Sequence, residues 1–283
     1  MAARPQTVLH SGSVQAELRY VIDTGAKPRT YISPQHSGQP SRRVDTVDIR
    51  EMRIHDAWPL AGEASLDREG FELHQQESQV CDFHDDEEVE RVHYPEIEGL
   101  IRRATGAARV SIFDHTRRSA GDRRPGVRDP VRSVHNDYTP KSGPQRVRDL
   151  FPEEAEGLLK RRFAVVNAWH SIRERVESHP LAVCDARSIA PKDLLATDLV
   201  YEDRVGEVFN LAHNPEHQWF YFPGIEQNQT ILLKCFDSAV DGRARFTAHT
   251  AFDDPETVDG APPRESIELR ALVFFDDGPS TGG

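Results

Sequence analysis

Short β-like segments recur at close spacing through the last third of the chain. Glycine and proline residues separate these segments, which lie at 199–201, 208–211, 218–222, 230–233, 245–252 and 267–275. Evenly spaced short strands with turn residues between them are typical of antiparallel sheets that pack on, or close around, one another. The sequence therefore predicts a mainly β (α+β) protein built as a sandwich or jelly roll.

Helical and extended segments precede this region. Apolar residues recur at helical intervals over 87–105, so we expect a helix there, which Pro95 kinks or divides into two pieces and which Gly106 ends. A second helix is expected over 145–162. Buried strands are expected over 108–114 and 163–169, and a turn that enters a strand over 66–73.

The first 65 residues differ in composition from the rest, because proline, serine and arginine are frequent in them. They contain short β-like runs such as 18–22, but Pro28, Pro34 and Pro40 argue against regular structure between those positions. We therefore expect an extended N-terminal arm over 1–65 that packs on the core. Residues 66–283 then form the β domain, and the chain has a single domain overall.

Composition restricts the compartment and the partners. The 283-residue chain has no apolar run of about 18 residues, which a membrane helix needs, and its first seven residues lack the apolar core of a signal peptide. Cys81, Cys184 and Cys235 are an odd, sparse set without CxxC spacing, which indicates reduced thiols and a cytoplasmic protein. The net charge of −12 argues against a nucleic-acid partner, since phosphate binding needs a basic surface.

Two potential metal ligands lie two residues apart in 133–139, which is predicted to be a strand. Because positions i and i+2 of a strand point to the same side, His135 and Asp137 would project an imidazole and a carboxylate into one space. These are two of the three groups of a facial triad, in which two histidines and a carboxylate bind iron and leave positions open for a cosubstrate and O2. His249, on the distant predicted strand over 244–252, is the best candidate for the third group.

A candidate anion clamp follows His249 in the sequence. Arg264 and Ser266 share one face of the terminal strand, so a guanidinium fork and a hydroxyl could hold a distal carboxylate together. Arg270 lies on the same face and is a candidate for a second clamp or for a supporting position behind the site. For Arg264 the alternative is an ordinary surface salt bridge.

Other chemistries account for these residues less well. Histidine and aspartate also bind zinc with a water, but nothing nearby supplies a general base in the manner of HExxH, and the arginine–serine pair would have no role. No GxSxG motif occurs, and Cys184 reads as a small apolar core residue rather than a nucleophile. Because the chain has 13 histidines, His213 and His217 stay open as alternatives to His249.

A basic segment lies just before the candidate ligands. Residues 117–132 are predicted to form a loop, and they include Arg117, Arg118, Arg123, Arg124, Arg128 and Arg132. One interpretation is a solvated loop. The other is a lid that attracts an anionic cosubstrate or substrate to an otherwise acidic protein.

Seven short stretches together resemble one known family. They are Asp114–Arg118, His135–Thr139, Asn167–Trp169, Pro180–Ser188, Leu233–Ser238, Ala248–Phe252 and Pro263–Glu268. The family is the CmcJ/AsaB-like group of iron(II)/2-oxoglutarate-dependent hydroxylase/desaturases of specialised metabolism, and the resemblance runs from about residue 66 to residue 275. One departure is His170-Ser171, where relatives usually carry Arg-Pro, and it bears on substrate choice rather than on the metal.

The resemblance implies a fold, cofactors and an activity. The fold is a double-stranded β-helix (jelly roll) in which His135, Asp137 and His249 bind Fe(II) and Arg264 binds the cosubstrate 2-oxoglutarate. The activity is that of a dioxygenase, an oxidoreductase that consumes O2 and forms succinate and CO2. It would hydroxylate or desaturate an unactivated C–H bond of a small specialised-metabolism substrate, and ring and peroxide formation also occur in the family.

Five aromatic and polar residues are candidates for substrate contacts. Side chains expected near the cavity could orient the substrate or belong to the core, and they are Asn167, Trp169, Tyr201, Trp219 and Tyr221. A non-catalytic cupin-like binding protein and an Fe(II) oxygenase that ignores 2-oxoglutarate are the rival functions. The arm could pack on its own chain or on a second copy, so the sequence is compatible with a homodimer and calls for no membrane partner.

Overall fold

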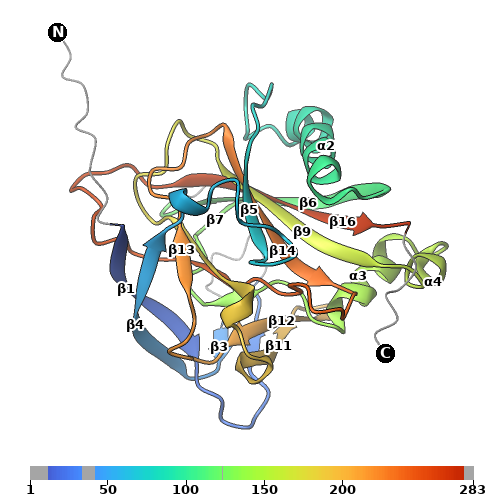
Figure 1. Cartoon of the computed structure of the whole chain (residues 1–283), viewed down its shortest axis with the longest axis horizontal. Helices are drawn as coiled ribbons and strands as arrows, with labels where there is room; N and C mark the ends of the chain where they lie inside the picture. The colour runs from blue at the N-terminus through green and yellow to red at the C-terminus, as the bar shows by residue number, and fades with distance from the viewer. Residues whose placement is uncertain (1–11, 34–41, 123, 277–283) are drawn as a thin grey trace.

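The computed structural model describes residues 12–33, 42–122 and 124–276, and its strands form two sheets (Figure 1). From edge to edge, the ten-stranded sheet contains β1 (Ser13–Val21), β4 (Val47–Asp56), β13 (Trp219–Tyr221), β10 (Leu181–Cys184), β15 (His249–Ala251), β8 (His135–Asn136), β12 (Val205–Leu211), β11 (Leu194–Val200), β2 (Arg29–Tyr31) and β3 (Arg42–Val44). The six-stranded sheet contains β5 (Phe71–Gln75), β14 (Gln229–Asp237), β9 (Phe163–Ser171), β16 (Glu265–Phe274), β6 (Arg109–Ser119) and β7 (Val127–Arg128).

The two curled sheets make a jelly roll, which confirms the predicted fold class. An apolar cluster lies between the sheets and includes Phe71, Val165, Phe222 and Leu233. All nine residues of β9 are buried, because β9 is central in its sheet and both of its faces are covered. This double coverage explains why apolar residues occupy consecutive positions over 163–166 instead of alternate ones.

A helical layer covers the outer face of the six-stranded sheet (Figure 1). The predicted helix over 87–105 forms as α1 (Asp86–Glu88), a π-helical turn (Val89–His93) and α2 (Tyr94–Thr105), so Pro95 lies at the start of a new piece. Gly106 ends α2 in the left-handed conformation with φ of 68°. Ile97, Leu100 and Ile101 are the buried residues of α2, as their helical spacing predicts.

Three local predictions were wrong. The single helix expected over 145–162 is two short helices, α3 (Ser142–Leu150) and α4 (Ala155–Leu158), because Pro152 cannot continue a helix. The strand expected over 133–139 contains only the two residues of β8. The loop expected over 117–132 is partly strand, since β6 extends through Arg118 and pairs with β7; Arg123 lies outside the described residues.

The N-terminal segment supplies strands to the ten-stranded sheet. In β1, Val14, Ala16, Leu18 and Tyr20 are buried at alternate positions, and β4 pairs in parallel with β13. A short strand, β2, follows Pro28 directly, so the expectation of no regular structure after that proline was wrong: proline is excluded from a strand interior, not from the position before it. Residues 1–11, Pro34 and Pro40 lie outside the described residues, and the division at residue 65 stays a prediction.

Within the described ranges, no helix has both the length and the apolar character that crossing a membrane requires.

Candidate active site

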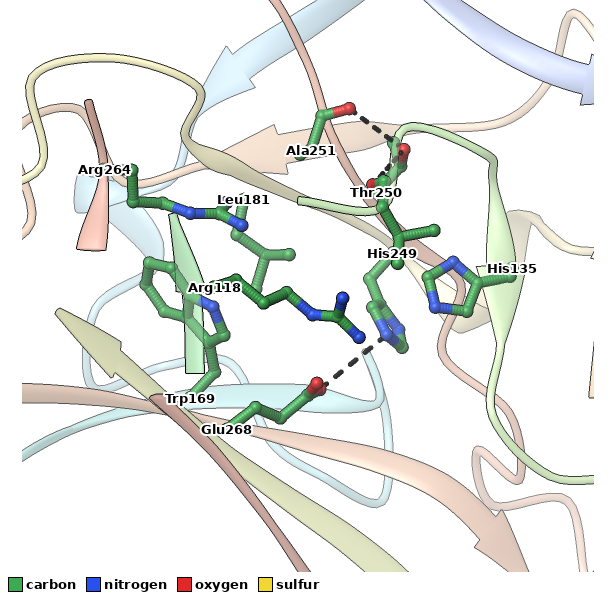
Figure 2. A pocket seen from close by; sticks show the side chains of 10 residues that line it. Arg118, His135, Trp169, Leu181, His249, Thr250, Ala251, Arg264 and Glu268 are labelled. Carbon is green, nitrogen blue, oxygen red and sulfur yellow. Dashed lines mark hydrogen bonds and ion pairs between the residues drawn. The ribbon is translucent and has the colours of Figure 1, made fainter. Parts of the chain in front are cut away.

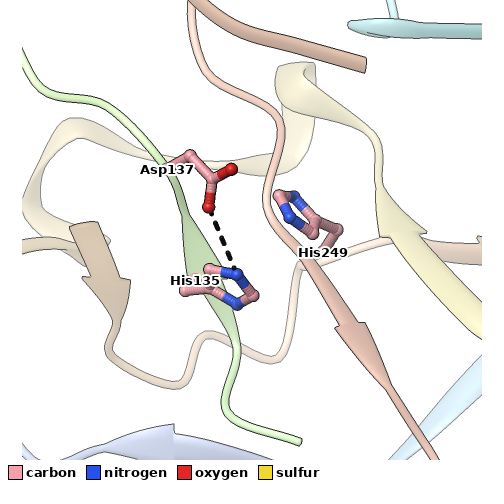
Figure 3. Close-up of side chains that lie close together, drawn as sticks. All are labelled: His135, Asp137 and His249. Atoms are coloured by element: carbon pink, nitrogen blue, oxygen red, sulfur yellow. Dashed lines mark ion pairs between the residues drawn. The ribbon is translucent and has the colours of Figure 1, made fainter. Parts of the chain in front are cut away.

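The three predicted metal ligands meet in the space between the sheets (Figure 3). His135 in β8 lies directly opposite His249 in β15, although 113 residues separate them in the chain, and their ring centroids are 4.4 Å apart. Asp137 follows β8, and its Oδ1 lies 3.4 Å from Nε2 of His135. One potential ligand atom from each of the three residues lies within 4.8 Å of the others. These donors, two imidazoles and one carboxylate, are the set that a facial triad requires.

Both histidines are held in the tautomer that binds a metal through Nε2. Nδ1 of His135 lies 2.8 Å from the carbonyl oxygen of Ser133, and Nδ1 of His249 lies 3.1 Å from that of Thr247. A carbonyl only accepts hydrogen bonds, so each Nδ1 carries the proton and each Nε2 presents its lone pair. Burial and the neighbouring His135 lower the pKa of His249, which keeps this imidazole neutral as metal binding requires.

Two side chains, on the side away from the histidines, orient the carboxylate of Asp137. Its Oδ2 accepts hydrogen bonds from Nδ2 of Asn167 at 2.8 Å and from Nε of Arg270 at 2.9 Å. Burial opposes ionisation, but the Arg270 guanidinium together with the two neighbouring imidazoles outweighs burial and holds the pKa of Asp137 well below its usual range. One oxygen is therefore occupied by protein donors, and Oδ1 is left on the side of the histidines.

Glu268 is a buried acid at the site that sequence reasoning missed. Its Oε1 accepts from Nδ2 of Asn167 at 2.9 Å and lies 3.9 Å from Nε2 of His249, while its Oε2 accepts from Nη2 of Arg270 at 3.0 Å. Arg270 also donates to Asp114 and to the hydroxyl of Thr116, so protein acceptors occupy it and it supports Asp137. Positions 264, 266, 268 and 270 share one side of an extended chain, so the same two-residue spacing that relates Arg264 to Arg270 would have identified Glu268.

Asn136 lies between His135 and Asp137 in the chain, and its side chain points away from them into the protein. Its Nδ2 donates to the carbonyl oxygens of Tyr138 at 2.7 Å and Cys235 at 2.9 Å, and its Oδ1 accepts from the backbone N–H of Thr247 at 3.1 Å. The side chain is fully buried. Asn136 thus ties the segment that carries His135 and Asp137 to the segment that carries His249.

We expect Asn136→Ala to lower the free energy of unfolding by about 2–3 kcal/mol, because three buried backbone groups lose their partner. The affinity for Fe(II) should fall with it, since the two ligand segments are no longer tied. Chemical denaturation and metal titration measure the two effects. Asn210→Ala is the matched control: Asn210 is also buried, but among the described residues its side chain bonds only Thr197, so metal affinity should be retained. Equal losses in both variants would contradict this role.

Arg264 of the predicted anion clamp lines a cavity that His135 and His249 also line, and it lies at the end away from them (Figure 2). The side chains of Arg264 and Ser266 are 2% and 1% exposed. Nη1 of Arg264 donates to the carbonyl oxygen of His179 at 2.7 Å, but its Nε and the Oγ of Ser266 have no hydrogen-bond partner among the described residues. Burial, then the nearby Arg118, lower the pKa of Arg264 to about 9, so the guanidinium is still charged at neutral pH. Buried donors without acceptors fit the carboxylate of a bound anion.

Two of the five predicted substrate contacts lie at the site. Trp169 lines the cavity, with the Arg264 guanidinium 5.4 Å from its ring centroid, and Asn167 contacts Asp137 and Glu268. The other three have different surroundings: Trp219 donates to the hydroxyl of Tyr20, Tyr221 packs against Phe252, and Tyr201 lies beneath Arg204 after β11. None of these three lines this cavity.

The alternative histidines lie elsewhere. His217 contacts Asp193 and the hydroxyl of Tyr20, and His213 lies against the Tyr20 ring. His170, at the predicted departure from the family pattern, bonds His93 of the helical layer at 2.8 Å between the two Nε2 atoms. These contacts place His170 on the outer face of the six-stranded sheet, away from the cavity.

Known proteins resemble this chain along most of its length. A family described as "Oxidoreductase/YMDC permease-like domain" matches residues 18–274. The hydroxylase/desaturase efuI of Hormonema carpetanum is 34% identical over 249 residues, which are 79% of this chain and 83% of that protein. The Fe(II)/2-oxoglutarate-dependent dioxygenase nvfI of Aspergillus novofumigatus is 32% identical over 270 residues, 92% of this chain and 96% of that protein. A solved structure of the iron and alpha-ketoglutarate-dependent endoperoxidase NvfI matches with a TM-score of 0.86 at 28% identity, covering 94% of this chain and 99% of that one.

Proposed function

This chain belongs to the family of Fe(II)/2-oxoglutarate-dependent hydroxylases and desaturases, and on that premise we propose that His135, Asp137 and His249 bind its Fe(II). The protein is an oxygenase that uses Fe(II), 2-oxoglutarate and O2. It hydroxylates or desaturates an unactivated C–H bond of a small specialised-metabolism substrate, with succinate and CO2 as the products of the cosubstrate. Arg264 and Ser266 receive the far carboxylate of 2-oxoglutarate.

One observation supports this assignment above the others. A facial set of metal donors lies at one end of a region between the sheets. At the other end lie two buried donors, Arg264 Nε and Ser266 Oγ, that have no partner in the described part of the chain. A hydrolytic zinc site would use the first group and leave the second without a role. A keto-diacid uses both, because one end chelates the metal and the other end carries a carboxylate.

The chain's own residues orient and enclose the reactants. His135 and His249 present Nε2, and Asn167 and Arg270 hold Asp137 so that Oδ1 faces the same point. Trp169, Leu181 and the backbone around Val131 line the cavity and exclude water. When bound, iron would activate O2 with electrons from 2-oxoglutarate, and O2 would supply the oxidising power that removes hydrogen from an unactivated C–H bond.

We also propose that the protein works in the cytoplasm and has no nucleic-acid partner. Its net charge of −12 supports the second statement, because phosphate binding requires a basic surface. All three cysteines are free, and burial raises the pKa of the Cys184 thiol to about 12, which suits a reducing compartment. The described strands of the N-terminal arm pair within their own chain, and a homodimer stays a prediction.

Succinate formation tests the proposed function. Purified protein loaded with Fe(II) should convert 2-oxoglutarate to succinate in the presence of O2 and a matching substrate. Chelation should abolish the reaction, and added Fe(II) should restore it. A cupin-like binding protein would form no succinate. An oxygenase that ignores 2-oxoglutarate would consume O2 at the same rate without the cosubstrate.

A further inference from the structure

A second guanidinium, that of Arg118, enters the cavity that Arg264 lines (Figure 2). Arg118 lies on β6 and pairs with Ser266 on β16, so its side chain starts beside the predicted clamp. Figure 2 shows that the side chain then runs past Trp169 and that its guanidinium points toward His249 and Glu268. The Arg264 guanidinium stays at the other end, near the Trp169 ring. The Arg118 guanidinium therefore lies at the end of the cavity near the predicted metal ligands, and the Arg264 guanidinium lies at the opposite end.

Neither guanidinium has a carboxylate partner within ion-pairing distance in the described part of the chain. Nη1 of Arg118 donates to the carbonyl oxygen of Asp129 at 3.1 Å, and Nη1 of Arg264 donates to that of His179. The acids of the site are already paired with another cation, Arg270. Burial lowers the pKa of the Arg118 guanidinium, and the charge of Glu268 offsets this only in part. Arg118, Arg264 and Arg270 face two carboxylates, Asp137 and Glu268, so one positive charge is in excess, and a bound metal dication would add to it.

Little room is left while Arg118 lies in this position. The free space in the cavity is about 20 Å³, which accommodates about one water. A keto-diacid with ten non-hydrogen atoms needs more, so its entry requires the Arg118 side chain to turn. One hydrogen bond to a backbone carbonyl holds the tip of this side chain, and that bond is easily exchanged for a charge-assisted one.

We propose that Arg118 binds the 2-oxo acid end of the cosubstrate, while Arg264 and Ser266 bind its far carboxylate. This inference rests on the proposed function and assigns one of these two guanidinium groups to each carboxylate of the dianion. The guanidinium of Arg118 is on the side of the metal ligands, so it meets the carboxylate that lies beside the metal. On binding, it exchanges the Asp129 carbonyl for that carboxylate.

Two probes separate the two ends of the cosubstrate. In O2-free solution, Fe(II)-loaded protein is titrated calorimetrically with 2-oxoglutarate, and with pyruvate, which has the 2-oxo acid end only. We expect Arg118→Gln to weaken the binding of both probes roughly tenfold to a hundredfold, the effect of losing a charge-assisted hydrogen bond. Arg264→Gln should weaken 2-oxoglutarate alone. Arg118→Lys keeps the charge but loses the fork, so its loss should be smaller.

The control and the contrary outcomes are defined by the same titrations. Arg128 pairs with Arg118 across β6 and β7 and its side chain is exposed, so Arg128→Gln removes an equal charge nearby and should leave both affinities unchanged. Unchanged Fe(II) affinity and thermal unfolding confirm that the Arg118 variants fold. Unchanged or tighter binding of 2-oxoglutarate by Arg118→Gln would overturn the inference, as would a loss confined to 2-oxoglutarate. If the unmodified protein bound neither probe, the proposed function would fail instead.

Discussion

Replacing His249 by alanine is expected to abolish Fe(II) binding and, with it, the formation of succinate from 2-oxoglutarate. The proposed site has three protein ligands, and His249 is the one supplied by β15, directly opposite His135. Changes to residues that merely orient a ligand typically cost tenfold to a hundredfold in metal affinity, so loss of a ligand should cost roughly a hundredfold or more. Metal content after gel filtration and anaerobic Fe(II) titration measure the effect.

His213 provides the matched control for this variant. It is one of the two histidines that the sequence left open as an alternative ligand, and it lies against the Tyr20 ring rather than at the triad. His213→Ala should therefore bind Fe(II) with unchanged affinity and keep its activity. The assignment of the metal site fails if His249→Ala retains stoichiometric Fe(II), or if His213→Ala loses it.

Replacing Arg264 by glutamine is expected to raise the Kd for 2-oxoglutarate about a hundredfold while Fe(II) binding is retained. A charge-assisted hydrogen bond contributes roughly 1.5–3 kcal/mol, and the variant also leaves a buried carboxylate without its counter-charge. Arg264→Lys should recover only part of the affinity, because a lysine cannot form the paired contacts of the guanidinium fork. Anaerobic titration gives the Kd, and the KM for 2-oxoglutarate in the succinate assay gives an independent value.

Arg173 is a suitable control for Arg264. It is an exposed arginine that pairs with Glu265, the residue between Arg264 and Ser266, and it does not line the cavity. Arg173→Gln should leave the Kd for 2-oxoglutarate unchanged. An unchanged Kd in Arg264→Gln would instead favour the rival in which the enzyme activates O2 without this cosubstrate.

Much of the site could be predicted from local patterns. The two-residue period of extended backbone brought His135 and Asp137 to one side. The same period placed Ser266 and Arg270 of β16 on one face with Arg264, the residue just before β16. The short strands separated by glycine and proline predicted the jelly roll for an equally local reason. These patterns depend only on neighbouring residues, so the chain displays them without its fold.

For other residues of the site, no pattern among neighbouring residues in the sequence indicates their role. Arg118 was placed in a loop, yet it lies on β6 and enters the cavity because β6 pairs with β16. Asn136 is one polar residue among many until Cys235 and Thr247 lie beside it. Trp219 and Tyr221 were equally plausible as substrate contacts or core, and their contacts with Tyr20 and Phe252 are those of the core.

The sequence by itself determined which side chains are available and which of them share a strand face. That includes the His-x-Asp pair, the Arg-x-Ser pair and the alternation that makes the sheets. Only the tertiary structure decided which faces meet: His135 opposite His249, Asn167 and Arg270 behind Asp137, and Arg118 beside Ser266. The physical reason is that side-chain direction along a strand repeats every two residues, whereas strand pairing depends on register between segments that are far apart in the chain.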